Sequence, residues 1–233
     1  MAIRPAADGG QLSETAEHYL EAIYYIAHEG ESVRPSGLAE WLGVSAPTVT
    51  VTLHRLARDG WLEVSGDRSV TLTHEGEEAA AAIVRRHRIL ERWLVDVLGL
   101  DWAAADLEAA RLAHGVSELV MGRIDEQLSY PRSCPHGNPI PGRAEVPSDL
   151  VRLDRLPAGR SASVSRISEV AEHEAPQLLR RLGQLGFMPG RTVVVRVAGS
   201  SLEVQIEGEQ VDLERAAARA VWVAPVDEPA AWS

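Results

Sequence analysis

Two pairs of potential metal-binding side chains lie near the middle of the chain. His87 and Glu91 are four residues apart within residues 84–94, so a helix would place them on one face, one turn apart. Asp106 and His114 are eight residues apart in the next segment, which is about two helical turns. Imidazole and carboxylate groups that converge from neighbouring helices are ligands for a divalent metal ion of borderline hardness. Together the four residues predict a metal site, whereas His87 and Glu91 alone would be read as an ordinary pair on a helix surface.

Two long helices must hold these side chains. The first is predicted from about residue 73 to about residue 99, with Thr73 as its N-cap. The second is predicted over residues 103–128, after a short break. Both carry more apolar surface than neighbours within one chain would cover, so we expect them to form a homodimer interface. The apolar positions are Ile83, Leu90, Leu94 and Val97 in the first helix and Leu107, Val116 and Val120 in the second.

The segment ahead of these helices has the order helix, glycine-containing turn, helix, hairpin. That order, with these element lengths, is typical of a winged helix-turn-helix domain that binds DNA. The alternative interpretation is a helical bundle with an incidental hairpin. The expected elements are a helix that begins at Ser13, helices over 35–42 and 46–59 with the turn 43–45 between them, and strands over 61–64 and 69–72.

The third of these helices carries side chains that suit the major groove. Its first turns hold a proline and small hydroxyl groups, which can approach phosphates and thymine methyl groups. Arg68 at the tip of the hairpin would contact a phosphate or the minor groove; the alternative is a solvent-exposed arginine without a DNA contact. The predicted DNA-binding residues are Ser45, Pro47, Thr48, Thr50, Val51, Thr52, Arg55 and Arg68.

The net charge of −11 argues at first sight against nucleic acid as a partner. The conflict is resolved if some carboxylates are metal ligands, because phosphate would then repel the apo form and attract the metal-loaded form. The single cysteine excludes an internal disulfide and fits a reducing compartment. Because there is no apolar run of signal-peptide or membrane-span type, we expect a soluble cytoplasmic protein.

The C-terminal third has a different periodicity. Residues 129–151 are rich in proline and glycine and are predicted to form a loop or linker. Residues 159–223 contain five short alternating segments and one helix, at 176–185, which is typical of a small SH3-like barrel. The fold class expected for the chain is therefore mainly α with β.

Six segments taken together are more specific than any one of them: SAPTVTVTLHRLARDGWL, GDRSVTLT, RRHRILERWL, AHGVSE, PHGNPIPG and LGQLGFMPG. With them the chain resembles, over about residues 13–224, the diphtheria-toxin-repressor family of metal-dependent transcriptional regulators. The resemblance implies a DNA-binding homodimer with two metal sites per subunit and no enzymatic activity. It also implies four regions: a winged helix-turn-helix domain (1–76), a helical dimerisation and metal-binding domain (77–150), an SH3-like, FeoA-type domain (151–226) and a disordered tail (227–233).

The resemblance also implies ligands for the ancillary metal site of that family. Every matching residue can ligate, although Asp106 stands where iron-type members have His. Some members also use a Cys and a His as ligands. Cys134 would then ligate alongside, or in place of, a residue of the SH3-like domain. The alternative is that Cys134 is simply a small buried group. The matching positions are His87, Glu91, Asp106, Glu174 and Gln177, with Cys134 and His136 beside Glu91.

The primary site of the family is depleted in this chain. His18 stands where the family has Met or Asp, Glu21 where manganese-type members have Glu, and His114 matches the family His. The two further ligand positions are Ala110 and Ala113, and alanine cannot ligate. The site is either rebuilt from the three remaining residues and water, with or without Glu17 or Glu108, or it is not used.

The donor set indicates which ion the protein uses. Imidazole, carboxylate and amide oxygen suit Mn(II) or Fe(II), and the missing sulfur of the iron-type primary site favours Mn(II); Zn(II) would also bind in vitro. We expect a metal-dependent regulator of metal-homeostasis genes that binds a palindromic operator and neither a membrane nor a small-molecule substrate. One alternative is a winged-helix transcription factor whose metal site is structural or a relic. The other is a metallohydrolase, for which a motif such as His-Glu-x-x-His is missing.

Overall fold

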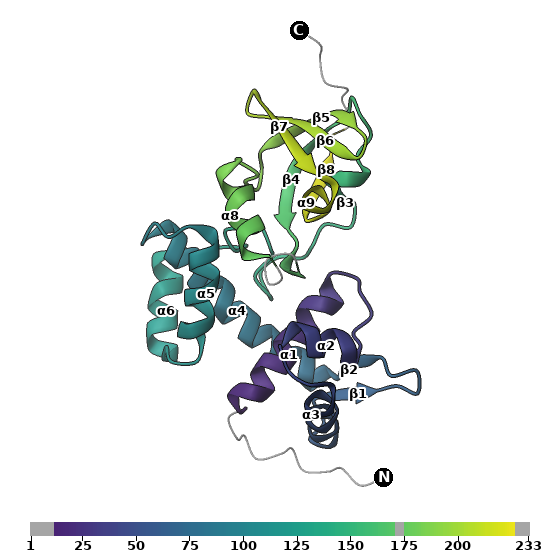
Figure 1. Ribbon diagram of the computed structural model, residues 1–233. Helices are drawn as coiled ribbons and strands as arrows, with labels where there is room; N and C mark the ends of the chain where they lie inside the picture. Colours follow the sequence, from purple (N-terminus) through teal and green to yellow (C-terminus); the bar gives the residue numbers. More distant parts are fainter. Residues whose placement is uncertain (1–11, 171–174, 227–233) are drawn as a thin grey trace. The chain divides into compact units, whose positions relative to one another are not determined.

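The computed structural model describes residues 12–170 and 175–226 (Figure 1). The chain divides into two compact units, and the boundary lies between Ile83 and Val84, within a long helix. None of the helices among the described residues is both long and apolar enough to cross a lipid bilayer. The residues expected to form a disordered tail, 227–233, lie outside the described part of the chain.

The first unit contains a helix-turn-helix followed by a hairpin, which confirms the predicted order. Side-chain caps start two of its helices: the hydroxyl of Ser13 accepts a hydrogen bond from Ala16 N at 3.3 Å, and that of Ser45 accepts one from Thr48 N at 3.4 Å. Apolar faces of all three helices and of the hairpin meet in one core. The elements are α1 (Glu14–His28), α2 (Pro35–Trp41), α3 (Ala46–Arg58), β1 (Leu62–Val64) and β2 (Val70–Leu72).

The helix α4 (His74–Asp96) begins immediately after this hairpin. The predicted cap is confirmed, because the Thr73 hydroxyl accepts a hydrogen bond from Gly76 N at 3.1 Å. A Cβ atom at Gly76 would lie 1.9 Å from the carbonyl oxygen of Trp61, so the first turn of α4 fits against the hairpin only with glycine there. At the other end α4 stops at Asp96, and Gly99 then adopts a φ of 71°, a left-handed conformation that changes the direction of the chain.

The single helix predicted over residues 103–128 is wrong, because the structure has two helices there. These are α5 (Trp102–Ala113) and α6 (Glu118–Gln127). His114 caps the end of α5, and Ser117 starts α6 by accepting a hydrogen bond from Val120 N at 3.4 Å. The C-cap at His114 and the new N-cap at Ser117 divide the predicted helix in two, although the apolar periodicity continues across the break.

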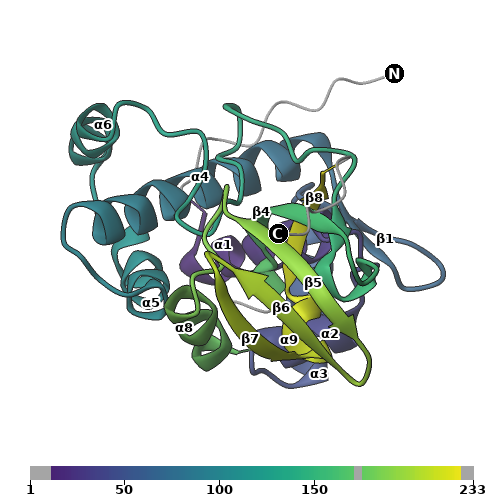
Figure 2. The same ribbon diagram turned by 90° about the horizontal axis from the view of Figure 1, so that it is seen from above.

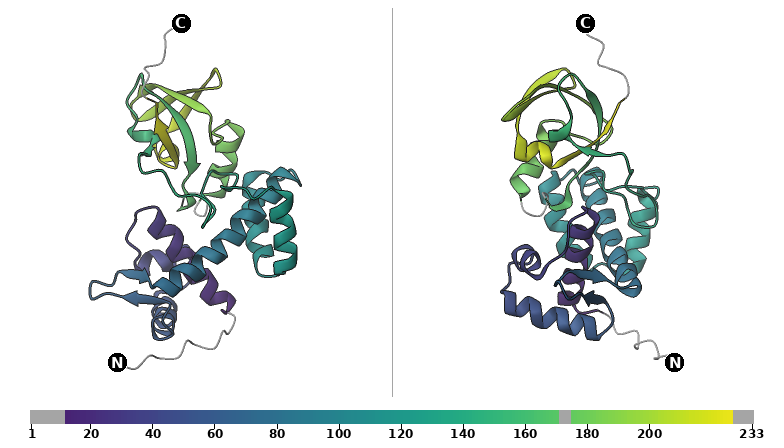
Figure 3. Two further views of the ribbon diagram at one scale, coloured as in Figure 1. Left: turned by 180° about the vertical axis from the view of Figure 1, so that it is seen from behind. Right: turned by 90° about the vertical axis from the view of Figure 1, so that its right-hand side faces the viewer.

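The C-terminal part of the second unit is an antiparallel sheet with the order β3-β8-β4-β5-β6-β7. Figure 2 shows its strands β5, β6 and β7 side by side. Its strands curve into a barrel-like shape, as the right-hand view of Figure 3 shows, and the SH3-like fold is thereby confirmed. All five strands predicted over residues 159–223 are present, and the sheet of the described residues has one more strand, at residues 151–152. The strands are β3 (Val151–Arg152), β4 (Ser161–Ile167), β5 (Thr192–Ala198), β6 (Ser201–Ile206), β7 (Glu209–Glu214) and β8 (Val221–Pro225), with the 3-10 turn Leu153–Arg155 and the helices α8 (Pro176–Gln184) and α9 (Arg215–Arg219).

The sheet encloses a core that includes a side chain from the helical part of the second unit. Trp102, the first residue of α5, packs with the barrel residues and is 5% exposed. A Cβ atom at Gly183 of α8 would lie 3.3 Å from the indole ring, so the small residue lets helix and ring approach closely. The helical part and the sheet therefore share one apolar cluster.

Candidate metal centre and nucleic-acid interface

The structure brings together three of the predicted metal ligands, from α4 and α5. His87 and Glu91 lie one turn apart on α4, and Asp106 faces them from α5. Nε2 of His87 is 3.4 Å from Oδ1 of Asp106 and 3.8 Å from Oε1 of Glu91. The side chains of His87 and Glu91 are only 9% and 3% exposed, which distinguishes them from a surface pair.

A second group of donors shares Glu91. Cys134 and His136 lie in the loop after α6, and both are buried. Nδ1 of His136 is 3.3 Å from Oε1 of Glu91. The ligand atoms of each group lie within 4.8 Å of one another, and these five residues form two groups that share Glu91 rather than a single group. One group offers nitrogen and oxygen; the other adds a thiol sulfur.

The loop that carries Cys134 and His136 is fixed by backbone bonds. Cys134 N donates to Asn138 O at 2.9 Å, and Ile167 N donates to His136 O at 2.9 Å. Gly137 has a φ of 90°, and a Cβ atom there would lie 2.1 Å from Ser165 O. The proline- and glycine-rich segment is therefore an ordered loop held on β4, and it places two side chains against α4.

The donor chemistry fits a divalent cation. Oε1 of Glu91 is buried and accepts no hydrogen bond within the described residues. A buried carboxylate oxygen without such a partner is costly unless a positive charge compensates it. Imidazole nitrogens face this carboxylate from two sides, and neutral imidazole with carboxylate is a common ligand pair for divalent ions.

The sequence predicts two further ligands for this site, Glu174 and Gln177. Glu174 lies outside the described residues. Gln177 is exposed in the first turn of α8, where its amide oxygen accepts a hydrogen bond from Arg180 Nη1 at 2.9 Å. Both remain predictions as ligands.

The predicted primary-site residues belong to different compact units. His18 and Glu21 are on α1 in the first unit, three residues apart; His18 is exposed, and the Glu21 carboxylate accepts a hydrogen bond from the Tyr25 hydroxyl at 3.1 Å. His114 caps α5 in the second unit and is exposed. Their assembly into one site remains a prediction.

The predicted DNA-binding residues of α3 lie mostly on its exposed side. Thr52 is the exception, because it is 8% exposed and lies with Val49, Leu53 and Leu56 among the buried residues of α3. The hydroxyl of Thr50 donates to Ala46 O at 3.0 Å and is thus already bonded to the helix backbone. Those on the exposed side of the helix or at its start are Ser45, Pro47, Thr48, Thr50, Val51 and Arg55.

The hairpin formed by β1 and β2, called the wing below, presents Arg68 at its turn. Arg68 is exposed and has a φ of 67°, a conformation that a non-glycine residue adopts only when the turn holds it. The Asp67 carboxylate accepts hydrogen bonds from Ser69 N at 3.1 Å and Ser69 Oγ at 2.8 Å. These bonds, with a smaller contribution from the charge of Arg34, hold the pKa of Asp67 below its ordinary value.

The sequence did not identify Arg34 as part of this interface. Its Nη1 donates to Asp67 O at 2.9 Å, so it ties the start of α2 to the wing turn. An arginine before Pro35 gives no recognisable sequence signal, because the contact joins residues 33 positions apart. Arg34 therefore positions the wing tip relative to the helix-turn-helix.

Known proteins resemble the whole of this architecture. The family model described as iron dependent repressor, N-terminal DNA binding domain, matches residues 11–70. The model for the metal binding and dimerisation domain of the same repressors matches residues 73–142, and a FeoA domain matches residues 151–225. The iron-dependent repressor IdeR of Mycobacterium tuberculosis is 39% identical over 229 residues, covering 93% of this chain and 99% of that protein.

The chain belongs to the diphtheria toxin repressor family. The diphtheria toxin repressor of Corynebacterium glutamicum is 35% identical over 225 residues, which are 93% of this chain and 98% of that protein. A solved manganese-dependent transcriptional repressor in complex with manganese has a TM-score of 0.80 at 38% identity and covers 91% of this chain and 100% of its own. As a member of this repressor family, the chain is a metal-dependent DNA-binding regulator.

Proposed function

We propose that the chain is a homodimeric repressor that binds a palindromic operator when a divalent metal ion occupies the His87–Glu91–Asp106 group. The observation that carries the proposal is the buried, unbonded oxygen of Glu91 between two imidazoles. It lies in the segment that matches the metal binding and dimerisation domain. A divalent ion there would supply the positive charge that allows these donors to stay buried together.

The ion that we propose is Mn(II), with Fe(II) as the alternative. His87, Glu91 and Asp106 offer one nitrogen and carboxylate oxygens, a set without sulfur that suits both ions. One similar solved structure is described as a complex with manganese, and the relative from Mycobacterium tuberculosis is named iron-dependent. Zn(II) would bind more tightly in vitro because affinity follows the Irving–Williams order, so affinity alone does not identify the physiological ion.

A spectroscopic test that depends on Cys134 shows whether the overlapping group of Glu91, Cys134 and His136 also binds metal. If it does, Co(II) added to the apo protein will give an intense near-ultraviolet charge-transfer band from the thiolate, and Cys134→Ser will abolish that band. If the group does not bind metal, the spectrum will be the same with and without the thiol. Asp106→Asn tests the other group and should leave the thiolate band in place.

The mechanism that we propose is a population shift between two arrangements of the dimer. Ligation by His87 and Glu91 would fasten α4 to α5 through Asp106. Because α4 begins directly after the wing strand β2, ordering of α4 would bias the DNA-binding domain as well. His18, Glu21 and His114 would form a second site that joins α1 to the dimerisation helices. Two half-sites are then read only when the recognition helices, one α3 per subunit, match the helical repeat of DNA.

A double substitution tests the proposal, with a matched control on the same helix. His87→Ala with Glu91→Ala removes the buried pair. His74→Ala with Glu78→Ala removes another His–Glu pair at the same spacing on α4, whose side chains are 82% and 70% exposed. In an electrophoretic mobility assay with a selected DNA duplex, Mn(II) should no longer stimulate binding by the first variant and should still stimulate binding by the second.

Two outcomes would overturn the proposal. One is metal stimulation of DNA binding that survives loss of the buried pair. The other is equally tight DNA binding by the wild-type protein in chelator and in excess Mn(II), which would instead support a winged-helix factor whose metal site is structural. Calorimetric titration of the apo protein with Mn(II) then distinguishes a structural site, which would still bind the ion, from a relic, which would not.

A further inference from the structure

Val51 is an apolar side chain that is largely exposed to solvent. It is 71% exposed and lies in the middle of α3, the second helix of the helix-turn-helix. At about 100° per residue, Val51 points away from the core residues Val49, Leu53 and Leu56 of the same helix. A single exposed valine is common on protein surfaces, so its surroundings decide whether it has a role.

The neighbours of Val51 on the helix surface suit a nucleic acid. Thr48 and Arg55 lie to one side of it, and Pro47 and His54 lie to the other, each within about 60° around the helix axis. The 13 residues of α3 include no acidic residue, although the whole chain carries a net charge of −11. The face therefore has an apolar centre with a hydroxyl and a guanidinium group on one side and a proline and an imidazole on the other, and its charge is complementary to phosphate.

The chemistry of base edges restricts what such a centre can contact. In the major groove the edges of guanine, cytosine and adenine present hydrogen-bonding groups, which an isopropyl group can cover but not satisfy. Loss of water from an unpaired donor or acceptor is unfavourable. The 5-methyl group of thymine is the apolar feature of the groove, and its burial against another methyl group is favourable.

We propose that Val51 determines operator specificity by packing against the 5-methyl group of one thymine in each half-site. The proposal rests on the DNA-binding function proposed above and adds a specific base to it. It also means that the side chain of Val51 does not recognise its base through a hydrogen bond, because that side chain has neither a donor nor an acceptor.

The test begins with a selected binding site. The Mn(II)-loaded full-length protein is used to select duplexes from a library with a random central segment, and each thymine of the selected site is then replaced singly by deoxyuridine. This change removes only the methyl group. For the wild-type protein, one thymine position in each half-site, related by the symmetry of the operator, should be sensitive to this change. A single replacement at either of these two positions should weaken binding about fourfold, the effect of one lost buried methyl group.

Protein variants complete a double-mutant cycle. Val51→Ala should bind thymine and deoxyuridine equally well at that position, whereas Val51→Ile should retain the preference for thymine. Val197→Ala, which shortens a 53% exposed valine in β5, is the matched control and should discriminate as the wild type does. Circular dichroism checks that each variant is folded.

Each result has a defined meaning. Equal binding of thymine and deoxyuridine at every position by the wild type, or a thymine preference that survives in Val51→Ala, would overturn the role of Val51 while leaving the repressor function intact. Failure of the selection to enrich any sequence, with and without Mn(II), would overturn the proposed function and this inference with it.

Discussion

At the level of single residues, Glu91 is where the two donor groups of the second unit meet. Its carboxylate faces His87 from the same helix and His136 from the loop. Because it belongs to both groups, its loss should be more severe than loss of a residue that belongs to one.

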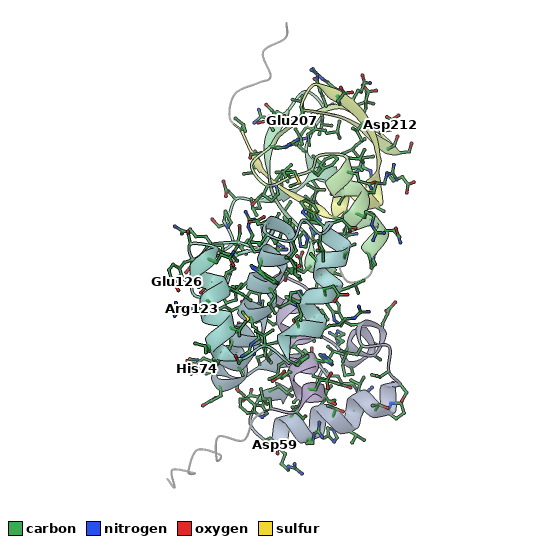
Figure 4. All side chains as sticks on the ribbon, turned by 90° about the vertical axis from the view of Figure 1, so that its left-hand side faces the viewer. Asp59, His74, Arg123, Glu126, Glu207 and Asp212 are labelled. Carbon is green, nitrogen blue, oxygen red and sulfur yellow. The ribbon has the colours of Figure 1, made fainter. Side chains whose placement is uncertain are left out.

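We therefore expect Glu91→Gln to abolish the rise in melting temperature that Mn(II) causes, whereas Asp106→Asn should only reduce it, since stabilisation by a ligand follows its affinity for the native state. Thermal denaturation with and without metal measures both. Glu126→Gln is the control, because Glu126 is exposed on α6 beside Arg123 (Figure 4) and its loss should not change the metal effect. A metal-induced shift of wild-type size in Glu91→Gln would contradict the shared role.

Asp67 gives a prediction about pH. Its pKa is depressed, so the bonds of its carboxylate to Ser69 are fully present above the ordinary value of about 3.9 and are lost as the pH falls through the lower, folded-state value. The amide resonance of Ser69, followed by NMR, should shift with that low midpoint in the wild type and should not shift in Asp67→Asn. A midpoint at or above the ordinary aspartate value would show that the wing turn does not hold the carboxylate.

At the level of elements, the junction between the wing and α4 depends on a glycine. Gly76→Ala should destabilise the first unit by more than about 2 kcal/mol, because the new Cβ atom would meet the Trp61 backbone. Gly122→Ala in α6 is the matched change: its Cβ atom would meet nothing within 4 Å, so it should stabilise the protein by about 0.5–1 kcal/mol. Urea denaturation measures both, and equal effects would contradict the close approach.

Periodicity predicted most of the elements and part of the metal centre, and its limits are physical. His87 and Glu91 could be found because four residues make one helical turn. The approach of Cys134 and His136 to Glu91 could not, since it depends on long-range bonds of an irregular loop. The two-residue strand β3 and the alanine-rich α9 are too short to show a period. Leu90 and Leu94, predicted at a dimer interface, are instead buried within the chain.

At the level of the whole molecule, the remaining apolar residues on the helices indicate where two copies meet. Leu119 and Val120 of α6 and Leu107 of α5 are 75%, 48% and 49% exposed. Exposed leucine and valine on neighbouring helices are a reasonable homodimer surface in a segment that matches a dimerisation domain.

We expect Leu119→Glu to shift the protein from dimer to monomer in sedimentation equilibrium and, as a consequence, to weaken operator binding. Val197→Glu, in the sheet domain, changes a 53% exposed residue and should leave the dimer intact. A Leu119→Glu protein that remains dimeric would place the interface elsewhere.

Trp102 affects how the C-terminal domain can be studied. Its indole belongs to the apolar cluster of the barrel, and its ring also meets the imidazole of His136 edge-on, with centroids 4.9 Å apart. A chain truncated after residue 150 would thus leave a tryptophan face open to solvent, next to a metal-binding candidate that had lost its support. Aggregation or altered metal affinity of such a fragment would then reflect an uncovered aromatic ring, and would say nothing about a regulatory role of the deleted domain.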